Sequence, residues 1–293
     1  MVNHWYYLQS YPRFLENKAA GRNILKASII IVNYNSKPFL ESCLASLKSN
    51  TDIPYEIIVV DNNSLDDSVV FLQKIRQPEI KLILNQSNFG FTKACNQGIS
   101  QASGDILVTM NPDILLPKGW LSRLCWHLLN NSNTLAVGPK GIGIGGPQAA
   151  VPLSYSSKLE AAARKFATVY RRQSEPAKYI IGCLFLFDRR LIEKIGYFDE
   201  NMPLGADDFD ISLRIRKSGY QLRIALDVLI KHFCHVSFNH SDTTECKRLE
   251  DISYQHFNQK WAKELQEFGW EHLMENDAPV FPHEKDLHFA CIK

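Results

Sequence analysis

Short apolar runs and longer amphipathic stretches alternate along the first half of the chain. The apolar runs are rich in β-branched residues, which is typical of buried strands, and the stretches between them have the spacing of helices with one apolar face. Strands are predicted at residues 27–33, 56–61, 80–84, 105–110 and 135–138, and helices at 38–48, 66–76, 90–102 and 121–129. This alternation is typical of βαβ units, so we expect an α/β fold with a mainly parallel sheet flanked by helices.

The pattern becomes irregular after residue 140. Residues 141–176 begin with several glycines and continue with a helical stretch that carries basic side chains. Regular patterning then returns as an apolar segment, a helix and a strand, at residues 179–188, 207–218 and 221–232.

The last part of the chain predicts a charged amphipathic helix at residues 244–268, whose apolar stripe contains Tyr254, Phe257 and Trp261. We therefore divide the chain into three parts. They are an N-terminal arm, a main α/β domain and a C-terminal helical extension, at residues 1–26, 27–240 and 241–293.

Composition narrows the classes of protein that fit. The chain has 293 residues, of which 45% are hydrophobic and 22% are charged, and this is enough for one substantial core. A formal net charge of +2 argues against nucleic acid as a partner, because proteins that bind it carry a strong basic excess.

Cysteine use and hydropathy indicate the compartment. The seven cysteines are scattered without a Cys-x-x-Cys pair, which argues against a disulfide framework and favours a reducing cytoplasm. No apolar stretch approaches the roughly 20 residues that cross a bilayer, and the N-terminus lacks the pattern of a signal peptide. We expect a cytoplasmic location, with a loose association at the inner face of the membrane left open.

A carboxylate follows the fourth predicted strand, where the apolar run stops at Asn111, Pro112 and Asp113. In open α/β sheets, ligands bind at the carboxyl ends of the strands. A carboxylate at that edge can hold a divalent cation, which in turn can hold a diphosphate. The alternative is a turn or a helix cap after the proline.

Two other strand ends carry polar groups. Asp61 ends the second strand and precedes Asn62, Asn63 and Ser64, a cluster that suits contact with a base or a ribose and suits a turn equally well. Residues 88–91 read Asn-Phe-Gly-Phe, where a glycine permits close approach of the backbone to a ligand. Taken alone, a helix start is the better interpretation of that segment.

A second acidic cluster, Asp207, Asp208 and Asp210, opens the helix predicted at 207–218. Carboxylates at a helix N-terminus interact favourably with the helix dipole, so capping is one interpretation. Three carboxylates in four residues exceed the needs of a cap. One of them could therefore be a general base whose pKa is raised by its neighbours and by partial burial.

The histidines and the glycine-rich segment are weaker signals. His232, His235 and His240 lie close together in sequence, but they do not have the spacing of a zinc site, and a lone histidine is more often a packed or surface residue. Residues 141–146 tempt comparison with a dinucleotide fingerprint. They lack the strand, tight turn and helix of that motif, so we interpret them as a flexible loop over a site.

Seven short motifs together form an ordered set that resembles family 2 glycosyltransferases, most closely the rhamnosyltransferase-like branch, over residues 27–240. They are residues 28–35, 59–64, 88–91, 104–105, 111–113, 196–200 and 207–210. The resemblance implies the GT-A fold and the transfer of a sugar from a nucleotide diphosphate donor, usually with inversion.

The resemblance also implies roles for single residues. Asp208 matches the catalytic base, Asp113 the last position of the metal-binding Asp-x-Asp motif, and His232 a later histidine that helps to hold the metal or the diphosphate. The metal would be Mn²⁺ or Mg²⁺, with Mn²⁺ better suited to mixed carboxylate and imidazole ligands. The donor side would comprise Asn33, Asn35, Asp61, Asn88, Asp105 and Asn111, with Asp61 at the base and Asp105 at the ribose or at the strand edge.

Two positions depart from the family pattern. Asn111 stands where the metal motif usually begins with an acid, which removes one negative charge from the metal site. Asp207 stands where a glutamate usually precedes the base.

Three rival classes fit the sequence less well. A non-catalytic GT-A-like module that binds a nucleotide sugar or a partner protein would have lost the base position, whereas Asp208 is present. A nucleotidyltransferase needs a glycine-rich, basic loop after the first strand, and residues 35–39 do not provide one. A nicotinamide-dependent oxidoreductase lacks its glycine fingerprint here.

The acceptor is expected to be a glycan or a lipid-linked glycan, shaped by residues 141–176 and 244–268. Basic residues of the first segment could contact a lipid diphosphate or an anionic membrane surface; they are Arg164, Lys165, Arg171 and Arg172. A solvated helix face is the alternative that we slightly favour.

Overall fold

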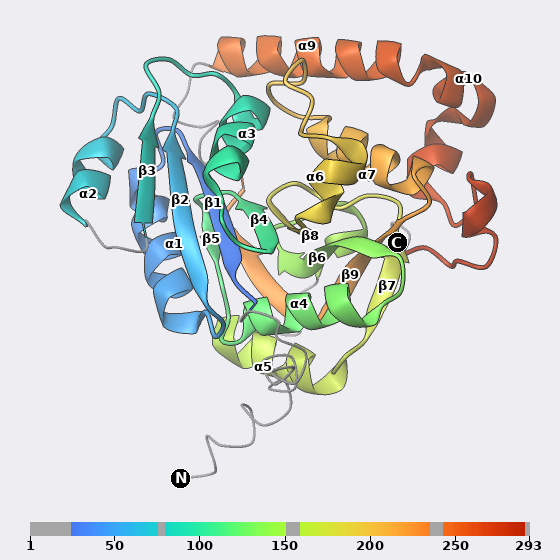
Figure 1. Ribbon diagram of the computed structural model, residues 1–293, viewed down its shortest axis with the longest axis horizontal. Coiled ribbons are helices and arrows are strands. Elements are labelled where there is room, and N and C mark those ends of the chain that lie inside the picture. The colour runs from blue at the N-terminus through green and yellow to red at the C-terminus, as the bar shows by residue number, and fades with distance from the viewer. Residues whose placement is uncertain (1–24, 76–79, 151–158, 235–242, 291–293) are drawn as a thin grey trace.

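A computed structural model describes residues 25–75, 80–150, 159–234 and 243–290 (Figure 1). Almost all of the predicted N-terminal arm, the boundary predicted after residue 240, and His235 and His240 lie outside the described residues. No helix in these ranges is both long enough and apolar enough to cross a membrane.

A nine-stranded mixed sheet, mostly parallel, forms the centre of the described molecule. Its first half consists of four parallel strands in the spatial order β3 (Ile80–Leu84), β2 (Tyr55–Asp61), β1 (Ala27–Asn33) and β4 (Ile106–Met110). The α/β prediction is therefore confirmed, and these four strands begin and end within one residue of the predicted positions.

The second half of the sheet changes direction. Strand β8 (Leu184–Asp188) is antiparallel to both of its neighbours, β4 and β6 (Thr134–Ile142). Strand β9 (Gln221–His232) is parallel to β6. The short strands β5 (Ile114–Leu115) and β7 (Ser174–Ala177) pair with β9 in the antiparallel sense.

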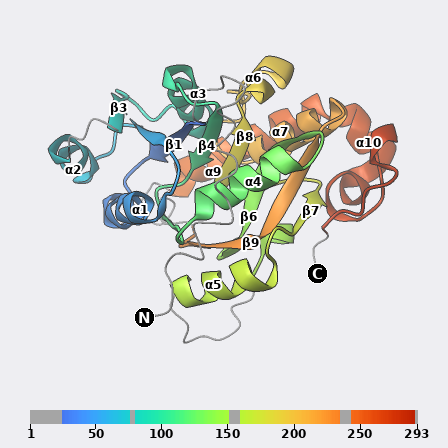
Figure 2. The ribbon, with the colours of Figure 1, turned by 60° about the horizontal axis from the view of Figure 1, so that its bottom comes forward.

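Alternate residues of the parallel strands enter two separate cores because successive side chains point to opposite faces of a sheet. One core joins Ile29 and Ile31 to helices α1 (Lys37–Asn50), α2 (Ser68–Lys74) and α4 (Trp120–Asn130). The other joins Ile30 and Val32 to helices α3 (Phe91–Gln101), α6 (Arg190–Ile195) and α7 (Asp207–Lys217). Figure 2 shows these two helical layers on either side of the sheet.

The region predicted to be irregular contains more strand than expected. Strand β6 continues to Ile142, beyond the predicted end at residue 138, because its last residues pair with β9. A 3₁₀ turn follows at Gly146–Gln148, and helix α5 (Leu159–Val169) packs on β9 through Leu229. Of the apolar segment predicted at 179–188, only the part from residue 184 onward is strand.

The helix predicted at residues 244–268 is two helices, α9 (Thr243–Lys260) and α10 (Ala262–Trp270), which meet at Trp261. In Figure 1, α9 crosses the top of the view and leads into α10 at its right. Phe257 and Trp261 are buried as predicted, but Tyr254 is 43% exposed and is not part of the apolar core. The prediction for Tyr254 was wrong because the apolar core packs on the end of α9 from Phe257 onward, and Tyr254 lies one turn before that contact.

The chain after α10 returns to cover α7. It contains a π-helical turn at Glu271–Glu275 and a 3₁₀ turn at Pro282–Glu284. Arg216 of α7 donates from Nε to Glu284 Oε1 over 2.6 Å, and both side chains are 1% exposed. Breaking such a buried pair leaves an uncompensated charge, so this contact holds the last segment on the domain.

Candidate active site

The first polar group lies where β1 and β2 end side by side, with Asn33 opposite Asp61. Asn33 Nδ2 donates to Asp61 Oδ2 over 2.7 Å, and the backbone N–H of Ser64 donates to Asp61 Oδ1 over 2.8 Å. The turn, which is the alternative interpretation of this cluster, is therefore present. Asn33 Oδ1 is buried without a hydrogen-bond partner, which leaves an acceptor available at this position.

Asn35 and Asn88 lie at the same edge, where Asn35 bonds to the loop that follows β2 and Asn88 bonds within its own loop. Asn35 has a left-handed backbone with φ of 50°, and its Oδ1 accepts a hydrogen bond from the Leu65 N–H over 2.7 Å. Asn88 is exposed, and its Oδ1 accepts from the Gly90 N–H over 3.0 Å. A Cβ at Gly90 would lie 2.7 Å from the backbone of Pro203, so this glycine admits a neighbouring loop rather than a ligand.

Asp105 lies elsewhere. It precedes the amino end of β4, whereas Asp113 follows the carboxyl end of the same strand. Its backbone N–H donates to Lys26 O over 2.9 Å, and its own carbonyl accepts from Arg189 N. Of the two roles that the family resemblance implies for Asp105, the ribose contact was wrong, because the residue is at the opposite edge of the sheet, and the support of the strand edge is what the structure shows.

Asn111, Asp113 and His232 come together where β4 and β9 end. His232 Nε2 lies 3.2 Å from Asp113 Oδ1 and 3.3 Å from Asn111 Nδ2. His232 Nδ1 lies 3.1 Å from the carbonyl oxygen of Gly143. A carbonyl can only accept, so Nδ1 donates to Gly143, and Nε2 faces Asn111 and Asp113.

This donor set fits a divalent cation. A histidine that ligates a metal usually donates its other ring N–H to a carbonyl or carboxylate, as His232 does to Gly143. In the described part of the chain, no three histidine, cysteine or acidic side chains are grouped so that they could hold a metal. Asp113 and His232 would therefore be its two charged or imidazole ligands, and phosphate oxygens and water would have to complete the shell.

Gly143 allows this arrangement because a side chain would not fit there. Its φ is +78°, and an added Cβ would overlap the carbonyl oxygen of His232 and lie 3.2 Å from Cys234 Sγ.

We expect Gly143→Ala to weaken metal-dependent nucleotide binding by about tenfold, the lower end of what displaced supporting groups cost a metal site. Titration calorimetry with UDP and Mn²⁺ measures this. Gly145→Ala is the matched control, because a Cβ at Gly145 meets nothing within 4 Å, and equal affinities of the two variants would contradict the prediction.

The second acidic cluster opens α7 after two consecutive left-handed residues, Gly205 and Ala206. Asp208 is half-buried, and its Oδ2 accepts from the Gly182 N–H over 3.0 Å and its Oδ1 from the Phe209 N–H over 2.9 Å. Burial raises the pKa of the Asp208 carboxyl above its usual value, although the two N–H groups oppose this. Burial, and then the charge of Asp208, also raises the pKa of Asp207.

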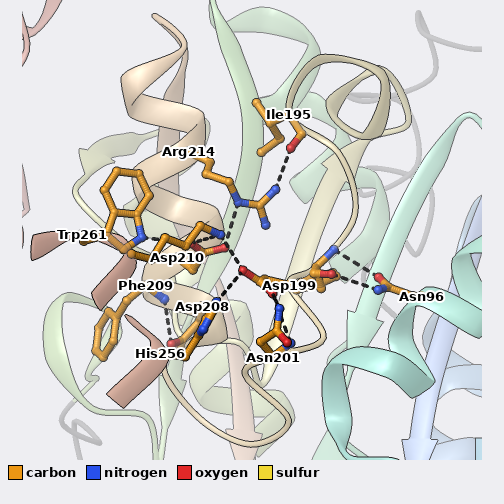
Figure 3. Close-up of polar contacts among 12 residues, drawn as sticks. Asn96, Ile195, Asp199, Asn201, Asp208, Phe209, Asp210, Arg214, His256 and Trp261 are labelled. Carbon is orange, nitrogen blue, oxygen red and sulfur yellow. Dashed lines mark hydrogen bonds and ion pairs between the residues drawn. The ribbon is translucent and has the colours of Figure 1, made fainter. Parts of the chain in front are cut away.

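Asp210 has a structural role. Its Oδ2 accepts from Arg214 Nε over 2.8 Å, and its Oδ1 accepts from Trp261 Nε1 over 2.9 Å (Figure 3). The Lys260 ammonium lies 2.8 Å from the same Oδ1. Only one of the three carboxylates, Asp208, is left partly exposed.

A short segment connects the two acidic groups. Gly182 donates its N–H to Asp208, and the carbonyl of the next residue, Cys183, accepts from the Asn111 N–H over 2.9 Å. The charges of both Asp113 and Asp208 help to raise the pKa of the Cys183 thiol, after the larger effect of its burial. Asp208 therefore contacts residue 182 directly, and Asn111, two residues before Asp113, bonds to residue 183.

Gly143, Gly182 and Cys183 were not predicted as site residues. Each acts through its backbone, and a backbone N–H or C=O has no residue type by which a sequence could reveal it. A signal existed only for Gly143, which occurs in the segment 141–176 that breaks the regular pattern.

These features define a class of protein, an α/β enzyme with an acidic site at the carboxyl edge of its sheet. The sequence profile described as glycosyl transferase family 2 matches residues 28–196, which is more than half of the chain. The chain therefore belongs to glycosyl transferase family 2, and it is a glycosyltransferase that uses a nucleotide-sugar donor.

Individual relatives match this chain at low sequence identity. The uncharacterized glycosyltransferase YwdF of Bacillus subtilis is 27% identical over 242 residues, which cover 79% of this chain and 84% of YwdF. The N-acetylglucosaminyl-diphospho-decaprenol L-rhamnosyltransferase of Mycobacterium tuberculosis is 25% identical over 221 residues, 66% of this chain and 71% of the relative.

Two solved structures share the fold. The mannosyltransferase PcManGT from Pyrobaculum calidifontis, in complex with GDP-Man and Mn²⁺, matches with a TM-score of 0.58 at 21% identity over 94% of this chain and 73% of that structure. GalNAc-T7 with UDP, GalNAc and Mn²⁺ matches with a TM-score of 0.62 at 18% identity over 85% of this chain. The match covers about half of that structure, 51%. The GT-A-like fold expected from the sequence is thus confirmed.

Proposed function

We propose that the protein transfers a sugar, with inversion, from a nucleotide diphosphate donor to a hydroxyl group, with Asp208 as the general base. The observation that carries this proposal is that Asp208 bonds to Gly182 while Asn111, which lies beside the Asp113–His232 pair, bonds to the next residue, Cys183. A base close to a cation site matches the needs of a displacement at the anomeric carbon, in which the hydroxyl loses a proton and the diphosphate departs with negative charge.

The residues have separate tasks in this mechanism. Asp113 and His232 would hold Mn²⁺ or Mg²⁺, which as a Lewis acid neutralises the charge that develops on the departing diphosphate. Asp208 accepts the proton of the attacking hydroxyl, and the N–H groups of Gly182 and Phe209 orient its carboxylate. Asn33, whose buried Oδ1 has no hydrogen-bond partner, is proposed as a further nucleotide contact at the ends of β1 and β2.

The donor is proposed to be dTDP-rhamnose or a UDP-sugar. The rhamnosyltransferase from Mycobacterium tuberculosis among the relatives supports the first, at the level of a distant similarity. The remaining donor contacts are proposed for Asn35, Asp61, Asn88 and Asn111. The acceptor is proposed to be a glycan or a lipid-linked glycan, and the name of the same relative contains a lipid-linked sugar.

Membrane contact at the cytoplasmic face stays a prediction. The basic residues at and after α5 are all exposed, as contact with an anionic surface requires and as a solvated helix face also requires; they are Arg164, Lys165, Arg171 and Arg172. The structure fits both interpretations equally.

A thermal-shift panel tests the donor side. A ligand that binds the native protein raises its melting temperature by mass action. We expect UDP or dTDP, and the matching nucleotide sugar, to raise the melting temperature in the presence of Mn²⁺ and to do so much less with EDTA. If no nucleotide changes the melting temperature with Mn²⁺ or with Mg²⁺, the proposed function is wrong. If nucleotide sugars bind and are never consumed with any acceptor, the non-catalytic module is the better description.

A further inference from the structure

Helix α9 runs along the segment that leads to Asp208 and contacts it turn by turn. The Ser253 hydroxyl accepts from the Leu204 N–H over 3.1 Å, and His256 Nε2 lies 3.2 Å from Asp199 Oδ2. One turn further, Lys260 Nζ lies 2.7 Å from the same oxygen of Asp199, which is labelled in Figure 3 together with His256. The predicted C-terminal extension therefore forms one wall of the site beside the proposed base.

Tyr254 is an exposed aromatic residue of this wall. It belongs to the helical stripe of Phe257, which is fully buried, but is itself 43% exposed. A ring carbon of Tyr254 lies 3.6 Å, and Glu250 Cγ 3.9 Å, from the point where a Cβ at Gly205 would stand. The aromatic ring therefore covers the backbone three residues before Asp208.

The charges around this ring are negative. After the effect of its own burial, the pKa of the Tyr254 hydroxyl is raised by the carboxylates of Asp208, Glu250 and Asp207, in that order. The pKa of the Tyr179 hydroxyl is raised to about 12 by burial and then by the charges of Asp208 and Glu275. The charged groups that raise the pKa of these two hydroxyls are carboxylates, and the basic groups of α9 at His256 and Lys260 pair with Asp199 instead.

From these contacts we propose an acceptor subsite in which an uncharged sugar ring stacks on Tyr254 and its hydroxyls donate to Glu250, with one hydroxyl at Asp208. The inference deepens the proposed function and rests on it. An aromatic face beside a few polar groups is how concave sites bind and orient small ligands. A sugar supplies an apolar ring face for Tyr254 and hydroxyl donors for the carboxylates.

The same wall disfavours a phosphate as the attacking group. A phosphate monoester would bring negative charge beside Asp208 and Glu250, and like charges at close range repel. It would also need no base, because it is already ionised at neutral pH. The acceptor therefore presents a sugar hydroxyl to the site, and any lipid phosphate of the acceptor lies beyond that sugar.

Saturation-transfer NMR measures this without turnover. The protein is saturated with UDP or dTDP and Mg²⁺, and methyl glycosides of hexoses, N-acetylhexosamines and deoxyhexoses serve as probes, with octyl phosphate as the phosphate monoester. We expect signals from one or more glycosides and none from octyl phosphate. Tyr254→Ala should weaken glycoside binding by about tenfold, the upper range for one aromatic contact, and Tyr254→Phe should largely retain it.

Ile252→Ala is the matched control, because Ile252 is a similarly exposed (39%) apolar residue of α9 that is not part of the stripe of Tyr254. The subsite is overturned if no glycoside binds, if Tyr254→Ala binds as well as the unchanged protein, or if octyl phosphate displaces the glycosides. Failure of the nucleotide to bind in the same samples would overturn the proposed function instead. A melting curve of each variant shows that it is folded.

Discussion

Asp208→Asn is expected to lose sugar transfer by roughly 10²- to 10⁴-fold, the range that general-base catalysis contributes. The amide keeps the shape of the side chain and can still accept a hydrogen bond from Gly182 N–H, but it cannot accept the proton of the acceptor. The shift in melting temperature on nucleotide binding should equal that of the unchanged protein within experimental error. Initial rates of nucleotide release with and without acceptor measure the loss.

The pH dependence of the unchanged protein gives an independent check. Burial raises the pKa of Asp208, so the carboxyl is protonated, and unable to act as a base, up to a higher pH than an exposed aspartate. The turnover number should therefore fall as the pH decreases through this raised pKa, and Asp208→Asn should lack that limb. Asp207→Asn is the matched control at the adjacent carboxyl. Transfer that survives in Asp208→Asn and is lost in Asp207→Asn would show that Asp208 is not the base.

Asp113→Ala is expected to remove metal-dependent nucleotide binding. Only two charged or imidazole ligands are available among the described residues, so loss of the carboxylate leaves His232 as the single one. Affinity for UDP or dTDP with Mn²⁺ should fall by more than about 100-fold, beyond what the loss of a supporting group costs. Titration calorimetry with and without Mn²⁺ measures the effect.

Asp105→Ala is the control for this prediction. It removes the same side chain at the other end of β4, where Asp105 supports the strand edge through its backbone. We expect this variant to bind nucleotide and Mn²⁺ as the unchanged protein does. If Asp113→Ala keeps metal-dependent binding, or if Asp105→Ala loses it, the cation site lies elsewhere.

The two-ligand site also predicts that metal and nucleotide bind cooperatively. A cation held by Asp113 and His232 alone keeps most of its water, whereas a bound diphosphate adds oxygen ligands. Metal and nucleotide should therefore bind together more tightly than either binds alone.

Periodicity determined the first half of the fold. The apolar runs that form β1, β2 and β4 are buried on both faces of the sheet, and a run of that kind has few other ways to bury its side chains. The same rule predicts that Asn33, Asp61 and Asp113 lie at one edge of the sheet, because parallel strands end together.

Other features depended on contacts between distant parts of the chain. Packing between elements that are distant in sequence sets three of them. They are the direction of β8, the break of the C-terminal helix at Trp261 and the exposure of Tyr254. Asp105 is a different case: it opens the predicted strand 105–110 and so lies at its amino end, whereas ligands of such sheets bind at the carboxyl ends, and the ribose role came only from the family resemblance.

By itself, the sequence determined the α/β architecture and the residue types at the strand ends, because burial of apolar side chains is encoded locally in their spacing. Only the tertiary structure decided that Gly182 and Cys183 connect Asp208 to Asn111 and that Gly143 orients His232. Those contacts are made by backbone groups, which every residue carries, so their partners are chosen by packing and not by residue identity.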